Sequence, residues 1–229
     1  MEAANEGEVL PMRVGERVSE ALWHPVAGAV AVAVIAPGAG NTMRATYFDG
    51  IVSGLADRGV AALRFDFVYA HEGRKSPDAA PLLFAAWRAA LAEAARVADG
   101  LPLIATGKSM GGRYASMLAA EEGADFPARA LVFFGYPLHA PKTPDQLRSE
   151  HLSSVTVPML LIQGTRDAFA RTDRLEPVLT SLGDRARVEW IEGGDHSHRV
   201  RGDRRSDEEI GRDLGAVAGA FVLDVIGKA

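Results

Sequence analysis

Short apolar segments of strand length recur along the chain with few polar residues inside them, and this pattern limits the fold more than any other feature. They are residues 29–36, 60–67, 102–106, 130–135 and 159–163, with a shorter candidate at 188–191. Strands that lack polar alternation are expected where both faces of a sheet are covered, as in a parallel sheet. The pattern therefore predicts a mostly parallel sheet buried on both sides.

Helical spacing fills the segments between these strands. Residues 81–98 place apolar side chains at three- and four-residue steps, and a final helix is expected to begin at the capping box Ser206-Asp-Glu-Glu209. Residues 8–24 are compatible with an antiparallel edge pair. This alternation predicts one three-layer α/β domain over residues 1–229, because no linker or repeat divides the chain. Reactive groups are then expected beyond the carboxyl ends of the strands.

The stretch ATGKSMGGRYAS, residues 105–116, fits two incompatible motifs. A P-loop needs a glycine five positions before Gly107, and that position is Pro102, which has no N–H to offer a phosphate. The alternative is G-x-S-x-G, the turn between a strand and a helix that presents a nucleophilic serine. A predicted strand precedes Gly107 and a predicted helix follows from Met110 to about residue 120. The context favours the second motif, with Ser109 as nucleophile.

A serine hydroxyl needs a base to take its proton, so partners must exist elsewhere in the chain. In this architecture an acid and then a histidine follow the serine in order, each after a later strand. Asp167 follows the segment 159–163, and His196 follows the segment 188–191. We therefore predict Ser109, Asp167 and His196 as a catalytic triad, with His196 as base and Asp167 orienting its imidazole.

Three neighbouring residues compete for two of these roles. His198, two positions after His196, is an alternative base, although the glycine pair before Asp195 and His196 favours His196. Asp195 and Asp173 are alternative acids; each is also explained as a solvated carboxylate in a loop or at a helix start.

An oxyanion hole needs two backbone donors aimed at the developing negative charge. The N–H of Met110, directly after the nucleophile, is the first candidate. The second is expected from the loop PGAGN after the first buried strand, with Ala39 preferred and Gly40 possible. An ordinary turn is the alternative interpretation of this loop.

Other residues near the predicted site have two interpretations. Lys108 is a candidate contact for an anionic substrate or the oxyanion; the alternative is a surface ammonium paired with a carboxylate. His139, at the end of a predicted strand, is a candidate substrate contact, as are Gly38 and Gly40. The loop 71–78 is either a substrate loop or a solvated turn.

Composition excludes several classes of protein. The chain has no cysteine, so disulfides, thiolate metal sites and thiol nucleophiles are absent, and no cofactor or metal is expected. A net charge of −5 argues against nucleic acid as a partner, and the Arg199–Arg205 cluster is interpreted as a solvated loop. The acidic N-terminus does not resemble a signal peptide, and the longest apolar run is too short to span a membrane. A cytoplasmic protein is expected.

With these residues in view, the chain resembles the α/β-hydrolase superfamily over nearly its whole length. More narrowly, it resembles small predicted hydrolases without a cap, related to testis-expressed hydrolase-like and dienelactone-hydrolase-like proteins. The segments PGAGNTM, LRFDFVY, GRKSPD, GKSMGGRYASMLA, FFGYPLHAP, LIQGTRDAF and GGDHSH carry the likeness. It implies an α/β-hydrolase fold with the triad named above. Pro37 stands where relatives more often have His, and Ala168 where Pro is frequent after the aspartate.

The length of one connection between strands limits how much of a substrate the protein can enclose. Residues 139–158 occupy the position where lids are usually inserted, and they have room only for a short helix near 145–151. We therefore expect no large cap domain and an open site, which disfavours a lipase for long acyl chains.

The leading prediction is a serine hydrolase of a small ester, thioester or related acyl compound, acting through an acyl-enzyme. An acyltransferase differs only in the second nucleophile, and a non-catalytic scaffold protein is the alternative from another class. Acyl length, leaving group and oligomeric state stay unassigned.

Overall fold

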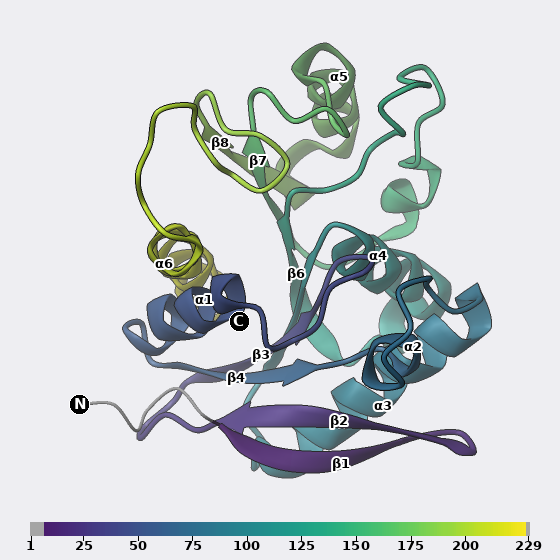
Figure 1. Ribbon diagram of the computed structural model, residues 1–229, viewed down its shortest axis with the longest axis vertical. Helices are drawn as coiled ribbons and strands as arrows, with labels where there is room; N and C mark the ends of the chain where they lie inside the picture. The colour runs from purple at the N-terminus through teal and green to yellow at the C-terminus, as the bar shows by residue number, and fades with distance from the viewer. Residues whose placement is uncertain (1–6, 228–229) are drawn as a thin grey trace.

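The computed structural model describes residues 7–227, and its centre is one twisted eight-stranded sheet in the order β1-β2-β4-β3-β5-β6-β7-β8 (Figure 1). The strands are β1 (Glu8–Val14), β2 (Arg17–His24), β3 (Ala31–Ala36), β4 (Val60–Phe65), β5 (Leu103–Lys108), β6 (Ala128–Phe134), β7 (Met159–Gly164) and β8 (Ala186–Ile191). Strands β3 to β8 are parallel, whereas β2 pairs antiparallel with both β1 and β4. The prediction of a mostly parallel sheet with an antiparallel edge pair is confirmed. Segments 1–6 and 228–229, including most of the acidic N-terminus, lie outside the described residues.

Helices cover both faces of this sheet and make the predicted three layers. Those of the described chain are α1 (Thr46–Ala56), α2 (Val68–His71), α3 (Ala80–Val97), α4 (Met110–Glu122), α5 (Thr172–Leu182) and α6 (Asp207–Ile226), with short 3-10 turns η1 (Gly123–Asp125), η2 (Glu150–Ser154) and η3 (Gly183–Arg185). Strand β3 illustrates the layering: Val32, Val34 and Ala36 join the core under α3 and α4, while Ala33 and Ile35 join the core under α1 and α6. Because successive side chains of a strand point to opposite faces, a strand buried on both faces must be apolar throughout.

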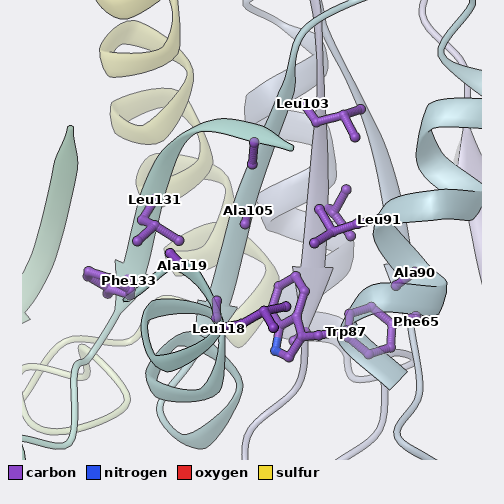
Figure 2. Packing of buried hydrophobic residues seen from close by; sticks show 14 of the residues in the cluster. Phe65, Trp87, Ala90, Leu91, Leu103, Ala105, Leu118, Ala119, Leu131 and Phe133 are labelled. Carbon is purple, nitrogen blue, oxygen red and sulfur yellow. The ribbon is translucent and has the colours of Figure 1, made fainter. Parts of the chain in front are cut away.

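Core packing reaches the turn that carries the predicted nucleophile. Trp87 of α3 is fully buried beside Phe65 of β4, with ring centroids 5.0 Å apart (Figure 2). Its indole Nε1–H donates to the carbonyl oxygen of Gly111 in α4 at 3.1 Å. The large side chain therefore contributes apolar burial and also fixes the first turn of α4 relative to the sheet.

Helices α1 and α6 approach each other unusually closely. They lie side by side on one face of the sheet (Figure 1). A Cβ atom added to Gly54 of α1 would lie 2.1 Å from the carbonyl oxygen of Arg212, and one added to Gly215 of α6 would lie 2.3 Å from that of Ile51. Glycine is therefore required at these crossing points, because any side chain would push the backbones apart.

One expected helix start is confirmed, and one expected helix lies further along the chain. The capping box of α6 is confirmed, with Ser206 Oγ accepting from the Glu209 N–H at 3.2 Å and a Glu209 carboxylate oxygen accepting from the Ser206 N–H at 2.7 Å. The short helix for which residues 145–151 had room is observed as a 3-10 turn, η2, which begins only at Glu150. The connection 139–158 is thus mostly irregular, and there is no large cap domain in the described chain.

Within the described residues, no helix combines the length and the apolar character needed to cross a membrane.

Candidate active site

Ser109 lies in the tight turn between β5 and α4, where the backbone adopts φ 49° and ψ −114°. A positive φ at a residue other than glycine is uncommon and costs conformational energy, so the surrounding structure must hold it. Two hydrogen bonds do so: the Ser109 N–H donates to the Phe134 carbonyl at 3.2 Å, and the Ser109 carbonyl accepts from the Arg113 N–H at 3.0 Å. The turn places the Ser109 side chain at the N-terminus of α4, where helix dipoles favour negative charge.

Close packing around this turn explains its small residues. A Cβ atom on Gly107 would lie 2.4 Å from the Gly112 nitrogen, and one on Gly111 would lie 2.5 Å from the Pro37 carbonyl oxygen. Real Cβ atoms do not approach backbone atoms so closely. The G-x-S-x-G pattern is therefore a packing requirement of the turn, as a nucleophile elbow demands.

Asp167 follows β7 and its carboxylate is buried, with the whole residue 3% exposed. Its Oδ1 accepts from the Phe169 N–H at 2.7 Å, and its Oδ2 accepts from the side-chain amide of Gln163 at 2.5 Å. These hydrogen bonds replace those that the exposed carboxylate would make with water, and Oδ2 can still accept a bond from a further partner.

That partner is His196, in the loop after β8. The imidazole Nδ1 lies 2.7 Å from Asp167 Oδ2, and Nε2 lies 2.9 Å from Ser109 Oγ. If Nδ1 carries the proton and donates it to Asp167, Nε2 is free to accept from the serine hydroxyl. The ring of Phe169 packs against the imidazole with centroids 4.4 Å apart. The three residues predicted from separate strand ends thus form one continuous chain of hydrogen bonds.

The alternative base and acids are engaged elsewhere. His198 is buried, with Nδ1 lying 3.0 Å from the Tyr47 hydroxyl and Nε2 2.9 Å from the Ile162 carbonyl oxygen; burial lowers its pKa to about 4. Asp195 accepts from backbone N–H groups of its own loop, and Asp173 pairs with Arg171 at the surface. Neither carboxylate is bonded to His196.

The loop after β3 lies directly against the serine. A Cβ atom on Gly38 would be 3.6 Å from the Ser109 Cβ, and Ala39 is exposed. Among residues 7–227, no acceptor receives a hydrogen bond from the backbone N–H of Ala39 or from that of Met110. The N–H of Gly40, by contrast, donates to the Tyr69 hydroxyl at 3.1 Å, so it is already occupied.

Further along, this loop is held by a buried carboxylate. Asp66 Oδ1 accepts from the Met43 N–H at 2.7 Å, and burial raises the pKa of Asp66 to about 6.

Lys108 is placed differently from both predictions. It is the last residue of β5, its side chain is buried, and its ammonium donates to the backbone carbonyl of His196. The predicted surface ion pair is wrong, because no carboxylate of the described chain pairs with this ammonium. A direct substrate contact does not fit either, since Nζ is directed into the histidine loop. Burial lowers the pKa of Lys108 to about 8.

His139 does not lie in an open site, contrary to the expected substrate contact. It is fully buried; Nε2 accepts from the Arg171 N–H at 3.1 Å, and Nδ1 lies 3.1 Å from the Ala140 carbonyl oxygen. Both ring nitrogens therefore have partners within the protein: Nε2 joins the segment after β6 to the segment after β7, and Nδ1 contacts the next residue of its own segment. The prediction placed His139 correctly at the edge of the sheet, but its side chain is buried and does not face a substrate.

Two residues at the site were missed in the sequence. Gln163 bridges Asp167 and a backbone N–H that follows β6, at 2.5 Å and 2.8 Å. Phe169 packs on the imidazole of His196. A signal existed for Gln163: it is the one polar side chain at the end of the apolar run MLLIQ, four residues before Asp167.

Within residues 7–227, no group of three or more His, Asp or Glu side chains is arranged to hold a metal ion. A hollow of about 480 Å³ lies between β8 and α6, lined in part by Arg187 and Phe221, and includes none of the residues above. The chemistry of the side chains, and not the size of the hollow, points to the Ser109 turn as the candidate site.

Comparison with known proteins agrees with this architecture. Residues 29–222 match the model of a family described as alpha/beta hydrolase domain. Among solved structures, a dienelactone hydrolase from Anabaena variabilis is similar with a TM-score of 0.75 and 20% identity, covering 97% of this chain and 99% of the other. Est1E from Butyrivibrio proteoclasticus gives a TM-score of 0.72 and 14% identity, covering 96% and 99%. XC6422 from Xanthomonas campestris, titled a member of a/b serine hydrolase without lid, gives 0.71 and 18%, covering 96% and 94%.

At these identities the solved structures establish the fold, which is the alpha/beta hydrolase fold without a large cap, and the resemblance to dienelactone-hydrolase-like proteins is confirmed at that level. The family model extends over most of the chain and includes the segments that contain Ser109, Asp167 and His196. The chain therefore belongs to the alpha/beta hydrolase domain family.

Proposed function

We propose that this protein is a serine hydrolase that cleaves a small ester, thioester or related acyl compound. One observation carries the proposal: an uninterrupted chain of hydrogen bonds runs from the buried Asp167 through His196 to Ser109, whose backbone is held at positive φ. A serine alone is a poor nucleophile, and this arrangement supplies both the base and the group that orients the base.

In the first half of the reaction, Ser109 Oγ attacks the carbonyl carbon of the substrate while its proton moves to His196 Nε2. The imidazolium that forms is stabilised by Asp167 Oδ2, 2.7 Å from Nδ1. The negative charge that develops on the carbonyl oxygen is received by the N–H groups of Met110 and Ala39, next to the N-terminus of α4. Collapse of this intermediate returns the proton from Nε2 to the leaving group and produces an acyl-serine.

In the second half, water takes the place of the leaving group. His196 Nε2 accepts a proton from the water, whose oxygen attacks the acyl carbon, and the same backbone donors receive the oxyanion. The proton then passes to Ser109 Oγ as the acyl bond breaks, and a carboxylic acid leaves. Each bond broken is matched by one formed, so no external cofactor is needed for this chemistry.

Support for a small acyl substrate comes from the surroundings of the site. The connection 139–158 is short and mostly irregular, so it provides no cap that could enclose a long acyl chain. Similar structures are titled as the esterase domain of a Rhodothermus marinus protein and as a dienelactone hydrolase, and both names describe cleavage of an ester bond.

Labelling with a fluorophosphonate probe tests the proposal. The wild type should be labelled, Ser109→Ala should not, and Ser181→Ala, which removes an exposed serine in α5, should be labelled like the wild type. A panel of p-nitrophenyl esters of increasing acyl length then defines the substrate range, with the shortest acyl chains expected to turn over best. A folded wild-type protein that resists the probe and hydrolyses no ester would instead indicate a scaffold protein that keeps the fold.

A further inference from the structure

The hydroxyl of Tyr69 lies between two backbone groups of the loop that follows β3. It accepts from the Gly40 N–H at 3.1 Å and donates to the Gly38 carbonyl in a longer contact of 3.4 Å. The same Gly38 carbonyl also accepts from the Asn41 N–H at 3.2 Å. Tyr69 therefore contacts the residues on both sides of Ala39, whose N–H is assigned above to the oxyanion.

Peptide geometry connects these contacts to the direction of the Ala39 N–H. The Gly38 carbonyl and the Ala39 N–H belong to one planar trans peptide, so they point in opposite directions. Hydrogen bonds from Tyr69 and Asn41 that hold the carbonyl on one side consequently hold the N–H on the other. Without them, this peptide would be freer to rotate, because Gly38 on its N-terminal side has no Cβ atom to restrict its ψ angle.

Tyr69 is itself held firmly. Its side chain is fully buried and its ring lies parallel to that of Phe67, with centroids 6.2 Å apart. Its backbone N–H donates to Asp78 Oδ2 at 2.9 Å, and its carbonyl accepts from the Arg74 N–H at 2.8 Å. Arg74 and Asp78 form an ion pair at 2.7 Å. The loop 71–78 thus anchors Tyr69, and its residues 71–77 are exposed, as expected of a solvated turn.

We propose that Tyr69 is a positioning residue that orients the Gly38–Ala39 peptide so that the Ala39 N–H faces the developing oxyanion. The inference rests on the proposed serine hydrolase function and adds a residue that touches neither substrate nor triad. Burial raises the pKa of Tyr69, so the hydroxyl keeps its proton and serves as acceptor and donor at the same time.

The test compares Tyr69→Phe with the wild type and with Tyr136→Phe. Tyr136 is a matched control, because it is also fully buried and its hydroxyl donates to a backbone carbonyl, that of Arg148, at 2.9 Å. Turnover of a p-nitrophenyl ester gives kcat and KM, and inhibition by a trifluoromethyl ketone reports binding of an oxyanion. Thermal unfolding of each variant measures the structural cost of the lost hydroxyl.

Direct removal of an oxyanion donor costs about 10²–10³ in kcat, and disordering one donor is expected to cost about 10-fold or more. Tyr69→Phe should lower kcat by that factor and leave KM within about threefold of the wild-type value. Binding of the trifluoromethyl ketone should weaken by the same factor as kcat. Tyr136→Phe should leave all three close to wild type. Should Tyr69→Phe fail to fold, Asp78→Ala removes the anchor of the Tyr69 N–H and is expected to lower kcat in the same direction.

Two results overturn the inference: wild-type kcat and inhibitor affinity in Tyr69→Phe (or in Asp78→Ala, if that variant must be used), or equal losses in Tyr69→Phe and Tyr136→Phe. Neither affects the proposed function, provided that the wild type is labelled by fluorophosphonate and Ser109→Ala is not. Failure of the wild type in that labelling experiment removes the proposed function and this inference together.

Discussion

The buried ammonium of Lys108 donates to the backbone carbonyl of His196, so the residue before the nucleophile holds the loop of the base. Space for this contact depends on Gly135, where an added Cβ atom would lie 3.0 Å from both Lys108 Nζ and the His196 carbonyl oxygen. The end of β5 and the loops that follow β6 and β8 therefore meet at one point. We therefore expect this contact, together with that of Asp167, to help hold His196 Nε2 near Ser109 Oγ.

Replacement of Lys108 by methionine is expected to lower kcat/KM for a p-nitrophenyl ester by roughly 10-fold. Methionine has a similar length but cannot donate to the His196 carbonyl, so the base is less firmly placed, and a small misplacement is costly in catalysis. The melting temperature should change little, because the lost hydrogen bond is offset by the removal of a buried charge. Lys142→Met, at an exposed position, is the control and should match wild type. Unchanged kinetics in Lys108→Met would show that Asp167 and the loop itself suffice.

The free energy of unfolding should fall as the pH is lowered from about 6.5 to about 4, with His198 as one identified cause. Burial lowers the pKa of His198 to about 4, whereas an unfolded histidine has a pKa of 6.5. Because the pKa in the folded state is depressed, the unfolded state binds the proton first. Stability is therefore fully present above pH 6.5 and is lost as the pH falls towards 4.

His198→Gln tests this assignment, because glutamine keeps one donor for the Ile162 carbonyl and one acceptor for the Tyr47 hydroxyl. Urea titrations at pH 7 and pH 4.5 should show a smaller loss of unfolding free energy in the variant, by about 2 kcal/mol. His24 and His151, whose pKa values burial also lowers to about 4, continue to contribute in both proteins. An identical loss in variant and wild type would exclude His198 as a source of acid sensitivity.

The central strands β3 to β7 were predictable because they are buried on both faces over almost their whole length, which leaves an apolar pattern that depends little on neighbours. The elements that the sequence did not reveal are those selected by tertiary contact. Helix α1 contains Gly50 and Gly54, which weaken a helical pattern and are required by the approach of α6. Helix α5 carries Pro177 in its interior and has no side-chain cap at its start. Local propensity alone therefore argues against both helices.

The residues of the candidate site also separate into those that the sequence predicted and those that it did not. Ser109, Asp167 and His196 were predictable because a strand end and the chain order specify where such residues meet. Lys108 and His139 were misjudged because a strand end specifies the edge of the sheet and not the direction of the side chain. Tyr69 acts through a hydroxyl bonded to backbone groups 29 and 31 positions away, and no local pattern records such a contact.

The close contact of α1 and α6 gives a stability prediction that is independent of catalysis. Gly215→Ala would place a Cβ atom 2.3 Å from the carbonyl oxygen of Ile51, and backbone atoms on both sides cannot move aside without separating the helices. We expect a loss of about 3 kcal/mol in unfolding free energy by urea titration, although alanine favours a helix over glycine. Ala220→Ser, on the exposed side of α6, should change it by less than about 0.5 kcal/mol. A stabilised Gly215→Ala would mean that helix propensity outweighs the contact and that the two helices separate at little cost.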